Sequence, residues 1–309
     1  MAGCNRFLSL LLTLLLPVSV WAQGGDALSF TRIERDPANA ALAGAGTALP
    51  AGAAWKAFSD AAMLPFTQGK MDAGVAYQYW APGTALSNNI QAGVAFKVMP
   101  RLAFSAGYAL NMGTPFATLG EFGEELGTTV KPMSHVVALG AGIGLGKKWS
   151  VGVNLRYAIE KGIDSHSGFS GDLSLAWQPL TSLRVSAGVA TLGTALASED
   201  GNKYQQPASA RLGVNWGLVL AEDHAIDLMA SGDVFFSGKV SGALGVQYGW
   251  RKMVFARCGY RLASEGCALP SHLGLGLGAC FHGFRLDVSY LTASKYIGNT
   301  LAVGLGYNF

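Results

Sequence analysis

From residue 69 to residue 309, large apolar side chains alternate with small or polar ones, and this alternation constrains the fold more than any other feature of the sequence. Residues two apart lie on the same face of a β-strand, so each alternating stretch predicts a strand with two different faces. The small and polar positions hold mostly Gly, Ala and Ser with scattered Arg, Asp and Asn, whereas the outer face of a soluble sheet would be rich in Lys and Glu. This combination is typical of a transmembrane β-barrel whose apolar face contacts lipid and whose polar face lines a narrow lumen. The clearest stretch has these residues on its apolar face: Trp149, Val151, Val153, Leu155, Tyr157 and Ile159.

The composition excludes several other classes of protein. Charged residues make up 13% of the chain, against roughly a quarter in soluble domains. Hydrophobic residues make up 50%, which is too much for a disordered chain. Beyond the N-terminal leader, no apolar run is long enough for a membrane-spanning helix. The formal net charge of +3, without concentrated basic clusters, gives no reason to expect a nucleic-acid partner.

The turn signals divide the alternating region, residues 69–309, into about fourteen antiparallel strands that are expected to close into an all-β barrel. An even number of strands places both ends of the barrel in the periplasm, and closure leaves no exposed sheet edge. Short and long connections alternate along the chain, which assigns the short turns to the periplasm and the long loops to the outside. The predicted strands lie near residues 70–80, 88–98, 101–110, 133–146, 148–160, 167–178, 182–193, 207–219, 224–235, 239–250, 252–263, 271–281, 283–292 and 299–309.

Residues 1–22 are predicted to be a cleaved signal peptide. Arg6 supplies the positive charge, residues 7–20 form the apolar stretch, and Val20-Trp21-Ala22 is a small-residue cleavage site before Gln23. An export signal followed by a barrel predicts location in the outer membrane of a Gram-negative cell, where the wall contacts outer-membrane lipid. The cysteines after the leader (Cys258, Cys267 and Cys280) lack Cys-x-x-Cys spacing, so neither a disulfide framework nor a zinc site is expected, and no cofactor is implied.

Residues 23–68 do not alternate and are expected to form a short periplasmic cap or plug. Asp36-Pro37 is typical of a helix start, with Asp as the N-cap and Pro at the first helical position. The segment is compact and rich in Ala and Gly, and a barrel of this size is too wide for its own side chains to fill. We therefore expect residues 36–64 to close the periplasmic mouth, with Trp55 and Phe58 as anchors on the inner wall.

Arginine and aspartate recur at polar-face positions of the predicted strands. We expect them to pair and to fill the lumen as a charge network, although a polar conduit that selects anions or a substrate is a second interpretation. No nucleophile, base and orienting acid come together around the histidines, so no enzymatic activity is expected. The network residues are Arg156, Arg184, Arg211, Arg257, Arg285, Asp172, Asp227 and Asp287, with Arg261, Asp72 and Asp233 also on polar-face positions.

Aromatic residues mark the periplasmic end of the predicted barrel. Four tryptophans fall on the apolar face near short turns, where they are expected to form an interfacial girdle: Trp149, Trp177, Trp216 and Trp250. The chain ends Tyr307-Asn308-Phe309 on an amphipathic strand. This ending resembles the signal read by the machinery that assembles outer-membrane barrels, with Tyr307 and Phe309 as its aromatic residues.

Two stretches resemble the PorV/PorQ family of outer-membrane proteins, which is related to the fourteen-stranded FadL-like barrels. The first is residues 39–48 followed by residues 58–64, with Asp60-Ala61-Ala62 at the position of the family's Asn-Pro-Ala. The second is residues 283–290 followed by residues 298–309. The resemblance implies a non-enzymatic accessory role in type IX protein secretion, with secretion components or secreted cargo as partners.

The alternative is a FadL-like transporter for small hydrophobic compounds. A gap in the barrel wall, or an apolar pocket under the extracellular loops, would favour transport. A closed and plugged lumen with an exposed apolar ridge on the loops would favour the partner-binding role. The inward positions are mostly small and polar, which weakens the expectation of an apolar path.

Deletion of Phe309 tests the assembly signal. If the terminal aromatic ring completes that signal, the truncated chain is still exported, but less of it reaches the outer membrane as a heat-modifiable barrel. The measurement is the ratio of folded to unfolded protein in outer-membrane fractions run on gels without heating. An unchanged ratio would show that assembly reads the preceding aromatic pattern instead.

Overall fold

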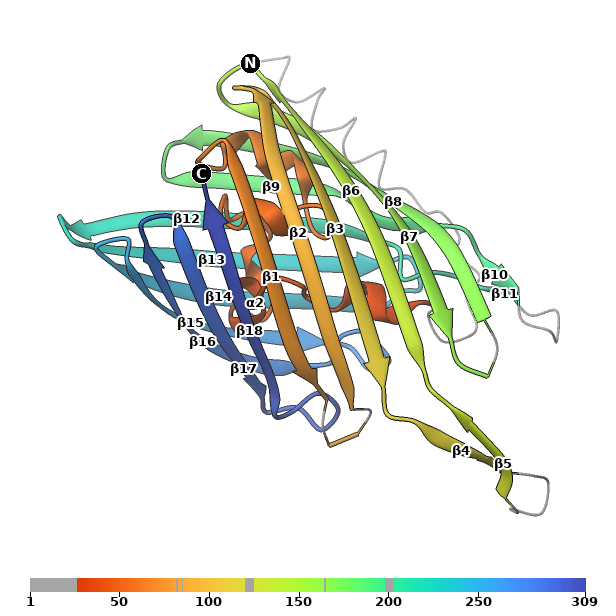
Figure 1. Cartoon of the computed structure of the whole chain (residues 1–309). Coiled ribbons are helices and arrows are strands. Elements are labelled where there is room, and N and C mark those ends of the chain that lie inside the picture. Colours follow the sequence, from red (N-terminus) through yellow and green to blue (C-terminus); the bar gives the residue numbers. More distant parts are fainter. Residues whose placement is uncertain (1–26, 82, 85, 120–124, 164, 198–202) are drawn as a thin grey trace.

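A computed structural model describes residues 27–81, 83–84, 86–119, 125–163, 165–197 and 203–309, and the predicted signal peptide lies outside these residues. Fourteen strands of the described chain form a closed barrel in which each strand runs antiparallel to its neighbours (Figure 1). The predicted fold class is therefore confirmed. No helix of the described part is both long and apolar enough to cross a membrane.

The barrel strands follow one another around the wall in sequence order, and β1 pairs with β18 to close it. Their bounds agree with the predicted ranges to within a few residues. The strands are β1 (Met71–Trp80), β2 (Ser87–Met99), β3 (Leu102–Gly113), β6 (Met133–Leu145), β7 (Trp149–Lys161), β8 (Ser165–Leu180), β9 (Leu183–Gly193), β12 (Ser209–Ala221), β13 (His224–Phe235), β14 (Val240–Trp250), β15 (Val254–Ala263), β16 (His272–Phe281), β17 (Phe284–Thr292) and β18 (Thr300–Asn308).

Two small hairpins interrupt connections that the sequence pattern treats as loops. Strands β4 (Phe116–Leu119) and β5 (Glu125–Val130) form a two-stranded sheet between β3 and β6, and it projects beyond the barrel (Figure 1). Strands β10 (Leu196–Ala197) and β11 (Lys203–Tyr204) form a second sheet between β9 and β12. Both hairpins lie at the end with the long connections, which is the extracellular end.

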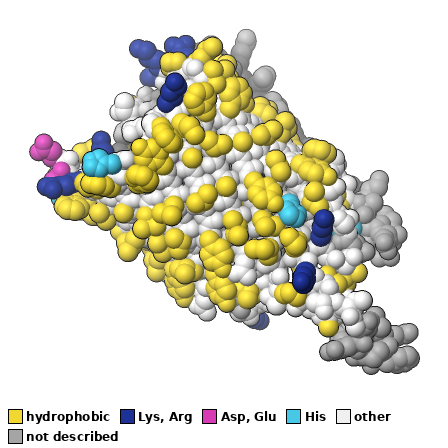
Figure 2. Space-filling view, viewed as in Figure 1, with side chains coloured by type: hydrophobic (Ala, Val, Ile, Leu, Met, Phe, Trp, Pro, Cys, Tyr) yellow, Lys and Arg dark blue, Asp and Glu magenta, His cyan; other side chains and the backbone are white. Residues whose placement is uncertain are grey.

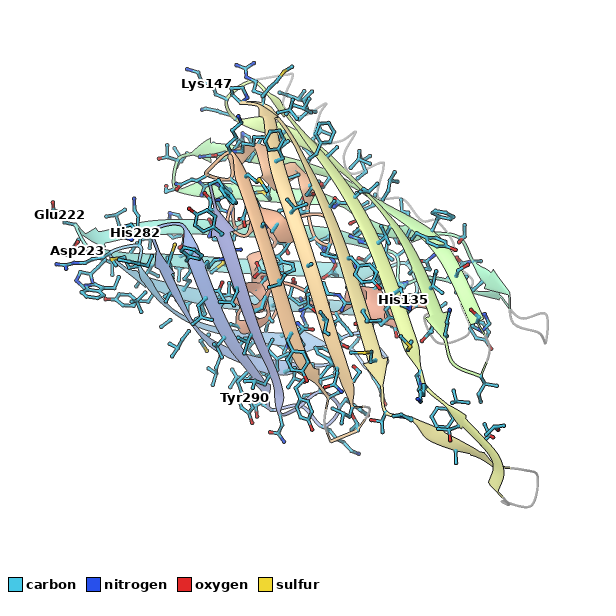
Figure 3. The ribbon with its side chains drawn as sticks, viewed as in Figure 1. His135, Lys147, Glu222, Asp223, His282 and Tyr290 are labelled. Carbon is cyan, nitrogen blue, oxygen red and sulfur yellow. The ribbon has the colours of Figure 1, made fainter. Side chains whose placement is uncertain are left out.

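The opposite end carries short turns. Between β16 and β17, His282 and Gly283 both have positive φ, 48° and 86°. Two such residues in succession match the right-handed twist of the flanking strands, which is why tight hairpins favour them. Figure 3 shows Lys147, Asp223 and His282 at this periplasmic end, with His135 and Tyr290 toward the other.

The two faces of the wall differ as the alternation predicts. Hydrophobic side chains cover the outer face, and the charged side chains in view gather near its ends (Figure 2). Leu155 is 61% exposed on the outer face of β7, whereas the neighbouring Asn154 is fully buried inside. The four girdle tryptophans are each at least 40% exposed, and Trp149 stacks on Trp177 with ring centroids 5.4 Å apart. Tyr307 packs edge-on against Phe284 and Phe309 at the periplasmic rim.

The N-terminal segment lies inside the barrel and forms a plug (Figure 1). Asp36 caps the predicted helix start by accepting a hydrogen bond from the Ala38 backbone N–H, and Pro37 is the first helical residue. The expected position is too shallow, because the segment is not confined to the periplasmic mouth. Its elements are η1 (Ser29–Arg32), α2 (Pro37–Ala41), η2 (Ala45–Ala48), η3 (Ala53–Trp55) and η4 (Ala61–Phe66).

Both ends of the plug are tied to the barrel by backbone hydrogen bonds. The Ala27 N–H donates to the Gln205 carbonyl in the connection before β12, at the extracellular end. The Lys70 N–H donates to the Phe309 carbonyl at the periplasmic end. The plug therefore runs along the length of the lumen.

Glycines of the inner wall allow the plug backbone to touch the sheet. A Cβ atom at Gly259 on β15 would overlap the Leu42 carbonyl, and one at Gly152 on β7 would overlap the Ala62 backbone. Gly144, also on the inner face, has more room, since its Cβ would lie 3.4 Å from the Arg101 side chain. Close packing along this seam depends on positions that carry no side chain.

The substitution Gly259→Ala is expected to destabilise the folded barrel by about 1–3 kcal/mol, because the added methyl group overpacks a site that cannot expand. Gly144→Ala is the matched control, and its stability should stay within about 0.5 kcal/mol of the parent. Urea unfolding in detergent micelles, followed by tryptophan fluorescence, measures both. Equal stability of the two variants would show that the plug does not press on the wall at β15.

Candidate functional site in the plugged lumen

The plug holds both predicted anchors against glycines of the wall. Trp55 is 3% exposed, and its ring lies over Gly74 on β1, 3.0 Å from where a Cβ would be. Phe58 packs over Gly107 on β3 in the same way. The two residues lie on one turn, since the Phe58 N–H donates to the Trp55 carbonyl over 3.0 Å. Each aromatic ring thus occupies space left by a missing side chain.

Most of the predicted lumen charges form ion pairs. The two terminal guanidinium nitrogens of Arg156 each donate to one carboxylate oxygen of Asp172, and one of these contacts measures 2.8 Å. Arg257 contacts Asp287 at 2.6 Å, and Arg285 bridges Asp287 at 3.3 Å and Asp72 at 3.2 Å. These pairs neutralise charge that the buried wall could not otherwise hold, because an isolated buried ion is strongly disfavoured.

Arg184 and Asp227 are brought near each other without a direct ion pair among the described residues. Arg184 contacts the side-chain oxygen of Asn215 at 3.5 Å, and the Asn215 amide donates to Asp227 at 3.4 Å. Gln247 also donates to Asp227, at 3.1 Å. Amide side chains therefore join charges that the prediction pairs directly.

The plug contributes charges of its own that the predicted network does not include. Asp233 forms ion pairs with Arg32 from η1 at 2.7 Å and with Arg211 from β12 at 2.9 Å. Arg261 lies 3.6 Å from the same carboxylate. Arg35 is 1% exposed and donates to the Asn111 side chain at 2.7 Å. The sequence does contain a signal for these plug charges, because charged residues stand out in a segment that is rich in Ala and Gly.

A small polar cavity lies beside these arginines. Its volume open to water is about 40 Å³, and its lining includes Arg32, Arg211, Asp233 and His272. That space accommodates only a few water molecules. The plug therefore fills the lumen at this level and leaves no wide polar passage there.

An apolar cluster lies under the extracellular loops. Its buried members are Leu28 of the plug and Ala109, Val136 and Ala158 of β3, β6 and β7. Phe30 and Phe58 of the plug pack against them, as does Leu196 of the β10–β11 hairpin. We call these seven residues the apolar cluster. Its largest side chains come from the plug and a loop, so the alternating pattern of the wall could not indicate it.

The barrel wall has a bulge next to this cluster. On β8 and β9, Gly171 pairs with Leu192 and Leu173 pairs with Val189, so that Ala190 and Thr191 together oppose Asp172. Thr191 has φ of 58°, which is unusual for a β-branched residue and indicates local strain. Its N–H donates to the Asp172 carboxylate at 2.7 Å instead of to a strand. Elsewhere on the described strands, the pairing shows shifts only near strand ends.

A chain of contacts links the bulge to the plug. Arg156 donates to the Phe58 carbonyl of the plug at 3.0 Å while it holds Asp172. Arg32 of the plug contacts the Thr191 hydroxyl at 3.4 Å. The position of the plug and the shape of the wall at β8–β9 are therefore held by the same side chains.

Among the described residues, no group of three or more His, Cys, Asp or Glu side chains could hold a metal ion. The aromatic residues of the predicted assembly signal lie on the outer face, away from the lumen, and Phe309 is 61% exposed.

A scan against protein-family models gives no match, and a search of curated proteins gives none either. Solved structures with a similar fold include the toluene transporter TbuX of Ralstonia pickettii (TM-score 0.65, 13% identity, covering 90% of this chain and 99% of that one). The toluene transporter TodX of Pseudomonas putida has a TM-score of 0.61 at 13% identity, with 85% and 97% covered. A FadL homologue of Pseudomonas aeruginosa has a TM-score of 0.56 at 9% identity, with 89% and 98% covered. The chain therefore has the fold of a FadL-like outer-membrane barrel.

The substitution Asp172→Asn is expected to destabilise the folded barrel by about 3–5 kcal/mol, because it leaves Arg156 buried without its counter-charge. The control is Asp223→Asn, which breaks an ion pair with Arg251 whose side chains are 43% and 55% exposed. That exposed pair should contribute at most about 1 kcal/mol. Urea unfolding of both variants in the same detergent measures the difference, and equal losses would contradict the assigned role of Asp172.

Proposed function

We propose that this barrel transports small hydrophobic compounds across the outer membrane. The observation that supports this function best is the apolar cluster under the extracellular loops, where large apolar side chains of the plug pack against the wall and a loop. A small apolar molecule entering from outside would meet there side chains of the plug, the wall and a loop that together form an apolar surface. Likeness in fold to two toluene transporters agrees with this proposal.

The plug has to move for a compound to pass. Along this path it is held by Arg32 with Asp233, by Arg35 with Asn111 and by the Phe58 carbonyl with Arg156. Each of these contacts involves a charged arginine, and a hydrogen bond to a charged group contributes about 1.5–3 kcal/mol. Water entering an opened lumen would hydrate these groups and offset part of that loss, so the contacts can break and form again.

The polar character of the inner wall does not conflict with an apolar cargo. The wall positions are small, so the larger apolar side chains of the cluster are Leu28, Phe30 and Phe58 of the plug, which pack on the smaller strand residues. The sequence of the strands alone therefore gives too little weight to transport of an apolar compound, because it leaves out the apolar side chains of the plug.

An accessory role in type IX secretion, as the PorV/PorQ resemblance implies, is the second proposal. Part of the first of the two stretches that carry the resemblance, residues 39–48, is buried inside the barrel. A partner could reach only the loops and the periplasmic rim, and no family model matches the chain. The buried position of this stretch is the reason that we favour transport.

Val136→Ser tests the transport proposal. Val136 is 1% exposed in the apolar cluster, and a hydroxyl group there should lower uptake of radiolabelled toluene into proteoliposomes by about fivefold, since an unpaired polar group costs about 1–3 kcal/mol. Val137→Ser is the control, because Val137 is next in sequence but 47% exposed on the outer face. Uptake no faster than in protein-free liposomes would refute transport of such compounds, and equal uptake by the two variants would refute the role of the cluster.

A further inference from the structure

The outer face of β6 to β9 has an apolar groove near the extracellular end. Its volume is about 720 Å³, and its outward-facing lining includes Val137, Leu139, Leu155, Tyr157 and Phe169. The strand register places these side chains in two adjacent rows. Tyr157 pairs with Val137 and Phe169, while Leu155 pairs with Leu139 and Gly171.

The groove has a structural cause. Gly171 has no side chain and forms its floor between Leu155 and Leu192. The bulge at Ala190 and Thr191 lies directly before Leu192 in the chain and bends the wall at this point. On one side, the rings of Tyr157 and Phe169 lie 4.5 Å apart and form a raised aromatic edge. The hollow is thus built by the backbone and does not depend on one flexible side chain.

Positive charge lies directly above the groove, toward the extracellular end. Lys161 ends β7 four residues beyond Tyr157, about 13 Å along the strand at the usual rise per residue. Lys131 precedes β6, and both lysines are exposed. Among the described residues, neither ammonium group has a carboxylate within 4.0 Å. Glu160, the neighbour of Lys161, has the opposite strand phase and faces the lumen side.

His135 lies beside these lysines and adds a hydrogen-bonding side chain to the rim. Its ring lies one row above Val137 on β6, and its Nδ1 is 2.8 Å from the Tyr108 hydroxyl. Figure 3 shows His135 toward the extracellular end of the barrel, opposite Lys147. In Figure 2, two Lys or Arg side chains lie close to a His at this edge of the apolar wall. The rim presents hydrogen-bond donors and positive charge at the level where lipid headgroups begin.

We propose that the groove and its rim bind a phosphorylated, acylated lipid of the outer leaflet. An acyl chain lies in the groove, and a phosphate group contacts Lys131 and Lys161. The groove faces the hydrocarbon of the membrane, so an acyl chain is the occupant that its surroundings supply. The two exposed lysines, which have no carboxylate partner among the described residues, select an anionic headgroup over a neutral one. The site is on the outer surface and does not rest on the proposed transport function.

Native mass spectrometry of the full chain in detergent micelles tests this proposal. Diphosphorylated lipid A is the probe, and fully dephosphorylated lipid A and inorganic phosphate are the comparison ligands. The double variant Lys131→Gln/Lys161→Gln should bind the diphosphorylated lipid about tenfold more weakly than the parent, since each lysine near an anionic surface contributes separately. The matched control is Lys147→Gln/Lys148→Gln, which removes two exposed lysines from the periplasmic turn of the same hairpin.

The expected result is strong retention of diphosphorylated lipid A by the parent and the control, with weak retention of the dephosphorylated form. A second variant, Phe169→Ser, leaves the lysines intact but removes one edge of the groove. It should weaken binding of diphosphorylated lipid A severalfold. Equal binding by the two double variants, or of the two forms of lipid A, would overturn the proposal. Binding of inorganic phosphate as tight as that of the lipid would also overturn it, because the groove would then contribute nothing.

Discussion

A wall of fourteen strands encloses more space than its own inward side chains can fill, and the rest of this structure depends on how that space is occupied. The inward positions are small, which would leave a wide water-filled pore. The N-terminal segment enters this space and packs its backbone directly on wall glycines such as Gly152 and Gly259. The small side chains of the wall therefore leave the space that the compact plug fills, and the plug backbone can pack closely only because those wall positions are small.

Burying the plug requires that its charges be compensated. Two plug arginines lie in the lumen. Arg32 forms an ion pair with Asp233 on the wall, and Arg35 donates a hydrogen bond to the Asn111 side chain. Replacing such groups by apolar residues of similar size often leaves stability unchanged or improves it, so their main effect is to specify position. A purely apolar plug could slide or rotate against small residues, whereas each of these arginines binds specific partners at fixed positions. The charge network fixes the plug in register with the wall.

The strands could be predicted from the sequence because a period of two residues places each side chain inside or outside without knowledge of its neighbours. The course of the plug could not, since residues 38–48 have neither a helical nor a strand period and depend on the wall for their shape. The bulge leaves a small trace: Val189 and Leu192 both face outward but are three residues apart instead of two. The charged residues of the lumen were identifiable, but their pairing was not, because Arg184 and Asp227 are joined by Asn215 rather than to each other. The apolar cluster was missed for a similar reason, as its large side chains come from three separate parts of the chain.

The bulge at β8–β9 gives the plug influence over the wall. In a regular sheet, backbone hydrogen bonds between neighbouring strands hold the strands together, and a change inside the lumen would leave these bonds intact. Here one ladder position is replaced by the Asp172 carboxylate, which is held by Arg156, which in turn contacts the plug at Phe58. Thr191 is strained in its present conformation and persists because the surrounding contacts hold it there. Withdrawal of the plug would remove the Arg32 and Phe58 contacts together and would leave the strained residue with fewer constraints. A movement that opens the lumen would therefore also loosen this part of the wall, so the two cannot be treated as independent parts of the barrel.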